Sequence, residues 1–131
     1  MAQPFQSSVI TPEGTVFEGP AEFIAVPAID GELGILHNRA PLLAKLGAGR
    51  LRIEAGGTSR EWFVSGGFAQ VIDNKVTILT QQAVARDQLS AEQAQAQLNE
   101  ARAMRATDEI AAKKKATLEA AARAQLRMAA K

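Results

Sequence analysis

The sequence predicts an α+β protein in which an N-terminal antiparallel β-sandwich is followed by a C-terminal antiparallel hairpin of two helices. All ten glycines, all five prolines and every aromatic residue lie before residue 69. The segment 81–131 contains none of these, and 17 of its 51 residues are alanine. Alanine has the highest helix propensity, whereas glycine and proline have the lowest. We therefore expect a β-sandwich domain over residues 1–84 and an α-helical hairpin domain over residues 85–131.

Apolar stretches separated by turn residues predict the strands of the first part. Within 50–54 the residues alternate, so Leu51 and Ile53 should face inward while their charged neighbours face outward. Asp73-Asn74 is a two-residue hairpin signal between two such stretches. Strands at this spacing are typical of a β-sandwich. The expected strands span residues 5–10, 15–18, 22–26, 42–46, 50–54, 60–64, 68–72 and 75–80.

The stretch Gly31-Glu32-Leu33-Gly34 predicts a sharp turn that leads into an apolar strand. Glycine adopts backbone conformations that cost other residues free energy, so the chain can reverse here. Glu32 is then expected at the tip of the turn, facing outward. The alternative is an ordinary hairpin in which Glu32 is only a solvated acid.

Capping signals divide the second part into two helices. Ser90, with Gln93 three residues later, fits a capping box, and that helix should run to about residue 105. The hydroxyl of Thr107, followed by two acids, predicts a second start, with a helix over 110–129. No strong breaker separates the halves, so one long helix remains an alternative. The apolar stripes expected to pack are Ala94, Leu98 and Ala101, and Ala111, Leu118, Ala122, Leu126 and Ala129. Alanine buries little area, so the hairpin should be held weakly and be able to detach.

The composition excludes several classes of protein. The formal net charge of +1 is too balanced for a dedicated nucleic-acid binder. The absence of cysteine excludes thiol catalysis and cysteine-based zinc sites, and the single histidine excludes an all-histidine site, so no metal is expected. No apolar run approaches the roughly 20 residues that span a bilayer, and the first residues lack the features of a signal peptide. We expect a soluble, cytoplasmic chain that meets a membrane only through partners.

No catalytic motif is present: there is no Walker loop, G-x-S-x-G or H-E-x-x-H. His37 lacks a recognisable partner acid, so a histidine in a surface loop is expected. No lysine or helix start follows Gly66-Gly67, which favours a strand bulge or tight turn over a phosphate cradle. The second part is basic, and its cations form either a solvated face or a surface for an acidic partner: Arg102, Arg105, Lys113, Lys114, Lys115, Arg123 and Arg127.

Two blocks of sequence resemble one known family. Residues 31–34 and 40–43 read Gly-Glu-Leu-Gly and Ala-Pro-Leu-Leu. Residues 64–71 read Val-Ser-Gly-Gly-Phe-Ala-Gln-Val, and residues 76–79 read Val-Thr-Ile-Leu. These blocks, in this order and spacing, are similar to those of the epsilon subunit of F-type ATP synthases, in its bacterial form. The resemblance covers nearly the whole chain and implies a β-sandwich followed by a helical hairpin.

The resemblance also implies a function and partners. The subunit would bind the gamma subunit in the central stalk, rest on the c-ring and couple proton-driven rotation to ATP synthesis. Its helices would extend toward the alpha and beta subunits and inhibit ATP hydrolysis. It would have no catalytic site or cofactor, and it would lie at the cytoplasmic face of the bacterial inner membrane.

Site residues carry over by position. The expected c-ring contact comprises Gly31, Glu32, Gly34, His37 and Arg39. The basic residues of the helices would face the alpha and beta subunits. Where some relatives have a nucleotide-binding motif with an acid and an arginine, this chain has a degraded form, so no nucleotide site is expected at Leu89, Ser90, Gln93 and Ala94. The family often has Pro, then Gly or Asn, then His before Ala-Pro, and this chain departs from that pattern with His37, Asn38 and Arg39.

Two other functions remain compatible with the residues alone. One is a non-catalytic β-sandwich adaptor whose helical hairpin binds a different protein partner. The other is a small enzyme that uses a carboxylate such as Asp30 or Glu32, although the missing catalytic set argues against it.

Overall fold

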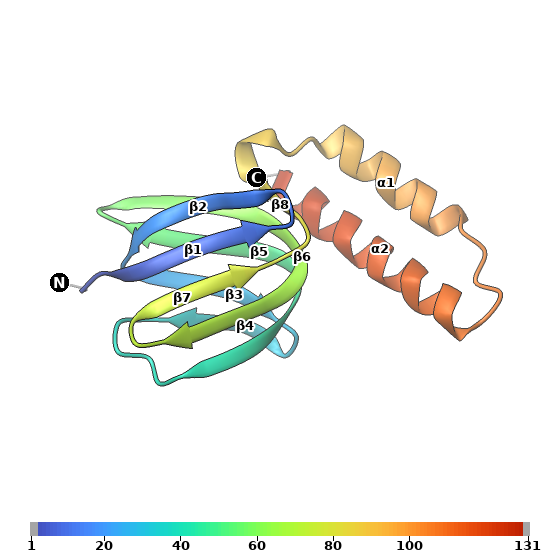
Figure 1. Cartoon of the computed structure of the whole chain (residues 1–131). Helices are drawn as coiled ribbons and strands as arrows, with labels where there is room; N and C mark the ends of the chain where they lie inside the picture. The colour runs from blue at the N-terminus through green and yellow to red at the C-terminus, as the bar shows by residue number, and fades with distance from the viewer. Residues whose placement is uncertain (1–2, 130–131) are drawn as a thin grey trace.

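The computed structural model describes residues 3–129 and has the predicted order of strands followed by helices (Figure 1). The strands lie in one part of the molecule, and the helices lie beside it. In chain order the elements are β1 (Phe5–Thr11), β2 (Gly14–Ala21), β3 (Phe23–Ala28), β4 (Gly31–Ile35), β5 (Leu42–Ala55), β6 (Thr58–Ile72), β7 (Lys75–Leu79), β8 (Ala83–Ala85), the 3-10 helix η1 (Arg86–Gln88), α1 (Ala91–Ala103) and α2 (Glu109–Ala129).

The strands of the described residues form one eight-stranded sheet that folds over itself into a sandwich. The strand order is β2-β1-β7-β6-β5-β3-β4, and β8 pairs with β6. All pairs are antiparallel except β1 with β7, which run parallel. The predicted antiparallel sandwich with a helical hairpin is therefore confirmed, with one parallel pair inside it.

The two longest strands differ from the sequence prediction. Segments 42–46 and 50–54 are one continuous strand, β5, and segments 60–64 and 68–72 are one strand, β6. The glycines between them bend the chain without ending it, because both strands bend together and remain paired through Leu46–Gly67 and Ala48–Ser65. Gly66 and Gly67 have φ values of 118° and 117°, but they lie inside a continuous strand whose register with β5 does not shift, so the predicted bulge or tight turn is replaced by a bend of both strands.

The core fills the space between the two layers of the sandwich. Leu51 and Ile53 are buried, as their alternation predicted. The β6–β7 turn at Asp73 and Asn74 also has the predicted form, since both residues have positive φ, as a tight two-residue hairpin requires. The remaining core is apolar and comes from most of the strands: Phe5, Val9, Ala21, Ile24, Val26, Ile35, Leu46, Trp62, Val64, Ala69, Val71, Val76 and Ile78.

The helices form an antiparallel hairpin, so the single long helix is excluded. The break covers residues 104–108. Ser90 caps α1 as predicted, because its Oγ accepts a hydrogen bond from the Gln93 N–H. The cap of α2 differs from the prediction: the carboxylate of Asp108, not the Thr107 hydroxyl, accepts the Ala111 N–H at 2.7 Å. Aspartate is the stronger N-cap residue of the two.

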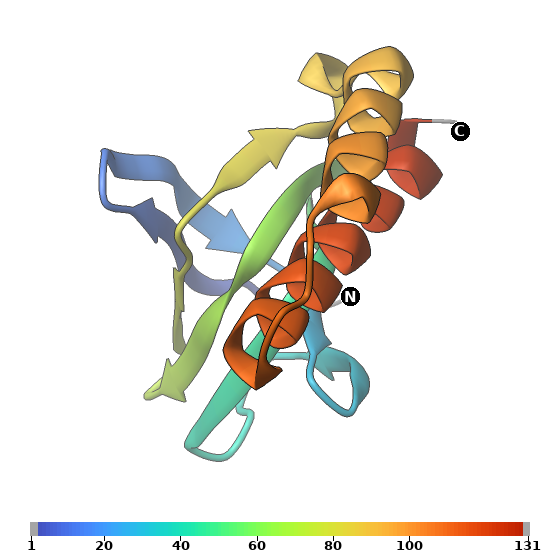
Figure 2. The ribbon, with the colours of Figure 1, turned by 90° about the vertical axis from the view of Figure 1, so that its right-hand side faces the viewer.

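The hairpin lies along the outer face of the layer that contains β5 and β6 (Figure 2). Helix α2 contacts β5, β6 and η1. Here Phe63 is fully buried in a small cluster with Ala124 and Met128. This apolar contact is small because its helix side consists mostly of alanine, and the weakly held hairpin stays a prediction.

The buried stripe of α1 was predicted correctly, but that of α2 was only partly so. Ala94, Leu98 and Ala101 are buried on α1. On α2 the predicted Leu118 is 42% exposed, whereas the buried residues are Ala122, Ala124, Gln125 and Met128. Helix α2 packs against both α1 and the sheet, so its buried face is rotated relative to the predicted stripe, which assumed a single neighbour.

No helix among residues 3–129 is long and apolar enough to cross a membrane.

Candidate interaction surfaces

The β3–β4 turn carries Glu32, but the acid does not sit at its tip as predicted. The turn residues are Ile29 and Asp30, and Gly31 opens β4 with φ 128°. Glu32 is the second residue of β4 and lies opposite Pro27 of β3. Its side chain is 53% exposed. The alternative of an ordinary hairpin is therefore closer to the structure, and the outward tip is formed by an exposed isoleucine and an aspartate.

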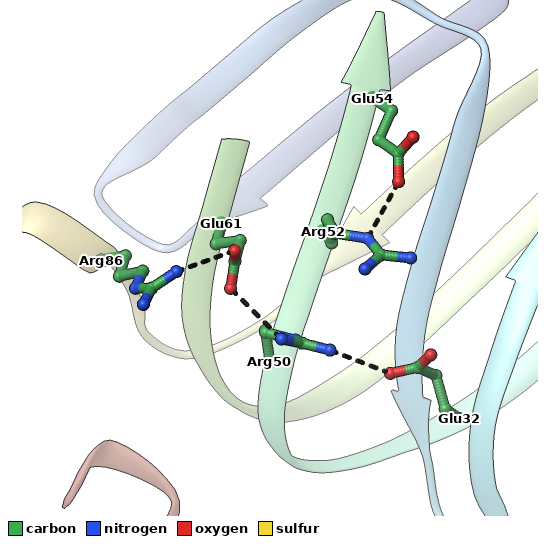
Figure 3. Close-up of polar contacts among 6 residues, drawn as sticks. All are labelled: Glu32, Arg50, Arg52, Glu54, Glu61 and Arg86. Carbon is green, nitrogen blue, oxygen red and sulfur yellow. Dashed lines mark hydrogen bonds and ion pairs between the residues drawn. The ribbon is translucent and has the colours of Figure 1, made fainter. Parts of the chain in front are cut away.

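Glu32 belongs to a row of four alternating charges that crosses the sheet (Figure 3). Arg50 of β5 lies 3.8 Å from the Glu32 carboxylate and 3.6 Å from Glu61 of β6. Arg86 of η1 donates a hydrogen bond of 3.0 Å to the other oxygen of Glu61. No local spacing predicts this row, because its members come from four elements that meet only through the strand order. A separate pair on the same face joins Arg52 to Glu54 at 3.1 Å.

The β4–β5 loop is fixed by two asparagines. Asn38 has φ 64°, and its N–H donates to the Asn74 Oδ1 at 2.7 Å. The Asn74 amide donates back to the Asn38 Oδ1 at 3.2 Å, which ties this loop to the β6–β7 turn. His37 is half-buried and Arg39 exposed on either side of Asn38. They lie at the opposite end of β4 from Gly31, and a strand of this length spans about 13 Å at roughly 3.3 Å per residue. The predicted ring-contact residues are thus not gathered in one cluster.

An exposed apolar face was not predicted as a site. Phe68 of β6 and Leu79 of β7 are cross-strand partners, and each is 46% exposed. Leu43, 68% exposed, lies opposite Gln70 two positions along the same face, and Ile72 continues it. A shallow hollow of about 370 Å³ beside Phe68 and Leu79 is also lined by Ile10 and Pro12. Adjoining exposed apolar side chains of this kind make the face a candidate interaction surface. The sequence signal was that residues 68–72 are apolar on both faces of the strand.

The cations of the helical part are exposed or half-buried, but they do not share one face. Successive residues of a helix point about 100° apart, so Lys113, Lys114 and Lys115 diverge. Arg123 pairs with Glu119, one helical turn before it, at 3.2 Å. Arg127 is exposed in the last turn of α2. Arg102 lies in the last turn of α1, and Arg105 lies in the link between the helices.

Comparison with known proteins identifies the family. A family model described as "ATP synthase, Delta/Epsilon chain, beta-sandwich domain" matches residues 4–86. An ATP synthase epsilon chain of Rhodopirellula baltica is 41% identical over 119 residues, which cover 91% of this chain and 93% of that relative. The chain belongs to the ATP synthase epsilon-chain family. A second epsilon chain, from Synechococcus sp. (strain PCC 6716), is 40% identical over 129 residues. That match covers 92% of this chain and 91% of the relative.

Solved structures have the same arrangement of sandwich and helices. A chain in the cryo-EM structure of the Euglena gracilis mitochondrial ATP synthase, which contains OSCP, F1 and the c-ring, superimposes with a TM-score of 0.84. It is 26% identical, and the match covers 98% of this chain and 82% of that one. A chain from the central stalk and c-ring of the Tetrahymena thermophila enzyme has a TM-score of 0.78 at 17% identity, with 98% of each chain covered, and supports the fold alone.

Membership of the epsilon-chain family separates the three functional hypotheses. Epsilon chains are non-catalytic subunits of ATP synthase, so the prediction of a subunit without its own reaction is confirmed. The generic adaptor and the small carboxylate enzyme are not supported. Within residues 3–129, no group of three or more His, Asp or Glu side chains is placed to hold a metal ion.

The residues that occupy the nucleotide motif of some relatives have structural roles here. Leu89 packs against the cluster of Phe63, Ala124 and Met128, and Ser90 caps α1. Ala94 is buried against α2 within the hairpin. Gln93 contributes only its backbone N–H to the cap. Leu89, Ser90 and Ala94 therefore have structural roles, and none of the four side chains is a cation that could pair with a phosphate.

Proposed function

We propose that this epsilon chain sits in the central stalk between the gamma subunit and the c-ring, and that it couples proton-driven rotation to ATP synthesis. A stiff block between two partners needs two separate docking surfaces. One observation carries the proposal: the sandwich exposes an apolar sheet face around Phe68 and Leu79, and an acid-bearing turn at residues 29–32. The Euglena and Tetrahymena structures that resemble it contain F1 or central-stalk subunits and a c-ring.

The apolar sheet face fits the gamma subunit. Phe68 and Leu79 stand side by side with half their surface exposed, and aromatic anchors of this kind dominate binding energy at interfaces. Phe68→Asp should therefore lower the amount of gamma subunit captured by a tagged chain by about tenfold or more. Ser59→Asp, an exposed position near the start of β6, is the matched control and should capture gamma normally. Equal capture by both variants would place gamma elsewhere.

The acid-bearing turn fits the polar loops of the c-ring. Ile29 and Asp30 form its tip, and Glu32 adds a second carboxylate beside it. These acids can pair with a basic loop tip, and such rim charges act mainly on association and register. Gly31 and Gly34 shape this strand, whereas His37 and Arg39 would reach the ring only if the contact runs along the whole β4 edge.

Reversal of the charge tests this contact. Glu32→Lys should weaken attachment of the ring and lower ATP-driven proton pumping in inverted membrane vesicles. Glu54→Lys is the control, because Glu54 is a paired and partly exposed acid on the same sheet face but far from the turn. Proton pumping that matches the control would remove Glu32 from the interface.

The helical hairpin is proposed to inhibit ATP hydrolysis. It is joined to the sandwich by a small, alanine-rich contact, so it can leave the sheet at modest cost and present its cations to acidic surfaces of the alpha and beta subunits. The proposed contact residues are Arg102, Arg105, Lys113, Lys114, Lys115, Arg123 and Arg127.

Truncation tests the regulatory role. A chain that ends after Gln88 keeps β8, which pairs with β6, and should raise ATP hydrolysis by the assembled enzyme while leaving its coupling intact. An unchanged rate of hydrolysis would remove the inhibitory role and leave the rotor role untouched.

The location follows from the same partners. We propose that the chain is held at the cytoplasmic face of the bacterial inner membrane by the c-ring and the gamma subunit. It should sediment with membranes that contain the whole synthase and appear in the soluble fraction when the c-ring is missing. Membrane binding that persists without the ring would contradict this location.

A further inference from the structure

The row of charges from Glu32 to Arg86 ends at the base of the helical hairpin. Glu61 lies inside the row, and its side chain is only 16% exposed. One of its carboxylate oxygens pairs with Arg50 and the other with Arg86. The contact with Arg86 is a hydrogen bond of 3.0 Å, whereas Arg50 lies 3.6 Å from Glu61 and 3.8 Å from Glu32, between the two acids. One carboxylate is therefore shared unequally between two cations (Figure 3).

The segment that contains Arg86, η1, contacts α2. Arg86 begins η1, and Leu89, directly after η1, packs into the cluster of Phe63, Ala124 and Met128 that holds α2 on the sheet. Glu61 lies two residues before Phe63 on the same face of β6. Glu61, Arg86 and Met128 also line one cavity of about 720 Å³ at the end of α2. Arg86 thus belongs to the short segment that joins the sheet to the cluster under α2.

We propose that this row of four charges makes docking of α2 depend on whether Glu32 is held by a second cation. When a basic group of a partner engages Glu32, Arg50 is released and closes on Glu61. Arg50 then competes with Arg86 for the same carboxylate, and the hold on η1 and α2 weakens. The inference rests on the proposed role of Glu32 for its biological trigger. It assigns Arg50 and Glu61 as positioning residues that link the turn to the hairpin.

The natural absence of cysteine provides a direct assay on the isolated full-length chain. Ala124 is buried between α2 and the sheet, so an Ala124→Cys thiol reacts with a thiol reagent only when α2 leaves. Glu32→Gln imitates the engaged acid and should raise the rate of modification about twofold, the effect expected of a partly exposed ion pair. Glu61→Gln removes the shared carboxylate and should raise it about fourfold.

Two further variants decide the mechanism. Glu54→Gln removes an acid of the same face from its own Arg52 pair, and should leave the rate unchanged. Arg50→Met removes the cation that contacts both Glu32 and Glu61. In that background, adding Glu32→Gln should not change the rate of thiol modification further. The emission of Trp62, the only tryptophan and a buried one, reports whether the sandwich remains folded in each variant.

The outcomes are distinct. A rate in Glu32→Gln equal to that of the parent, or an effect of Glu32→Gln that persists beside Arg50→Met, overturns the coupling. The assay contains no other subunit, so its failure leaves the proposed ring contact standing. Conversely, Glu32→Lys could lose ring attachment while the modification rate of the Ala124→Cys thiol stays unchanged. That result would support the contact between Glu32 and the ring and would overturn the coupling between Glu32 and α2.

Discussion

Truncation of Phe63 to alanine should release the hairpin without unfolding the sandwich. Phe63 is fully buried, but its side chain points away from the main core and toward Ala124 and Met128 of α2. Buried Phe→Ala changes cost about 3–5 kcal/mol, as the sum of lost burial and the cavity left behind. Phe63 is the largest side chain of the buried cluster between α2 and the sheet, and its neighbours there are mostly alanines, which bury little area. Most of the loss should therefore appear in docking, where about 3 kcal/mol changes the equilibrium more than a hundredfold.

Spin labels at two exposed positions would measure this release. With Gln70→Cys on the sheet and Ala120→Cys on α2, the parent should give one short distance distribution, and Phe63→Ala should give a broad, longer one. Val71→Ala is the matched control, because Val71 belongs to the interior core. It should lower the free energy of unfolding and leave the label distance unchanged. If Phe63→Ala also lowers the unfolding free energy by the full amount while the distance stays short, the reasoning about a separable hairpin is refuted.

Three smaller predictions follow from the same structure. Gly67→Ala should lower the unfolding free energy in urea by about 2–4 kcal/mol, because a Cβ there would collide with the Leu79 carbonyl; Gly56→Ala, where the space is open, should cost about 1 kcal/mol. Asp108→Ala removes the cap of α2 and should cost about 1 kcal/mol, seen as faster amide exchange in the first turn of that helix but not in α1. Asn74→Gly keeps the turn geometry but removes the acceptor for the Asn38 N–H, whose exchange should speed up about tenfold while neighbouring strand amides stay protected.

The division into strands and helices could be predicted because it depends on local chemistry. Alanine after residue 81, the Ser90 cap and the Asp73-Asn74 turn each act over a few residues, and each appears in the structure as expected. The stripe of α1 was predictable for the same reason, since that helix packs chiefly against one neighbour.

The features that were missed depend on the strand order. Gly47 and Gly66 look like strand ends in isolation, but β5 and β6 bend together and stay paired through them. Glu32, Arg50 and Glu61 are far apart in the sequence, and only the placement of β3 between β4 and β5 brings the first two within reach. The sequence identified Glu32 as a candidate site residue but gave no information on which side chain it faces.

The continuity of β5 and β6 has a mechanical consequence for a rotating shaft. The two strands stay antiparallel and in one register from Leu42–Val71 to Ala55–Thr58. Both layers of the sandwich therefore belong to a single hydrogen-bonded sheet. A twisting force applied at the β3–β4 turn passes to β5 and onward to β6 and β7 through rows of backbone bonds that share the strain. If this turn meets the ring as proposed, these backbone bonds are the path by which torque would enter the sandwich, whereas the helices lie outside that path.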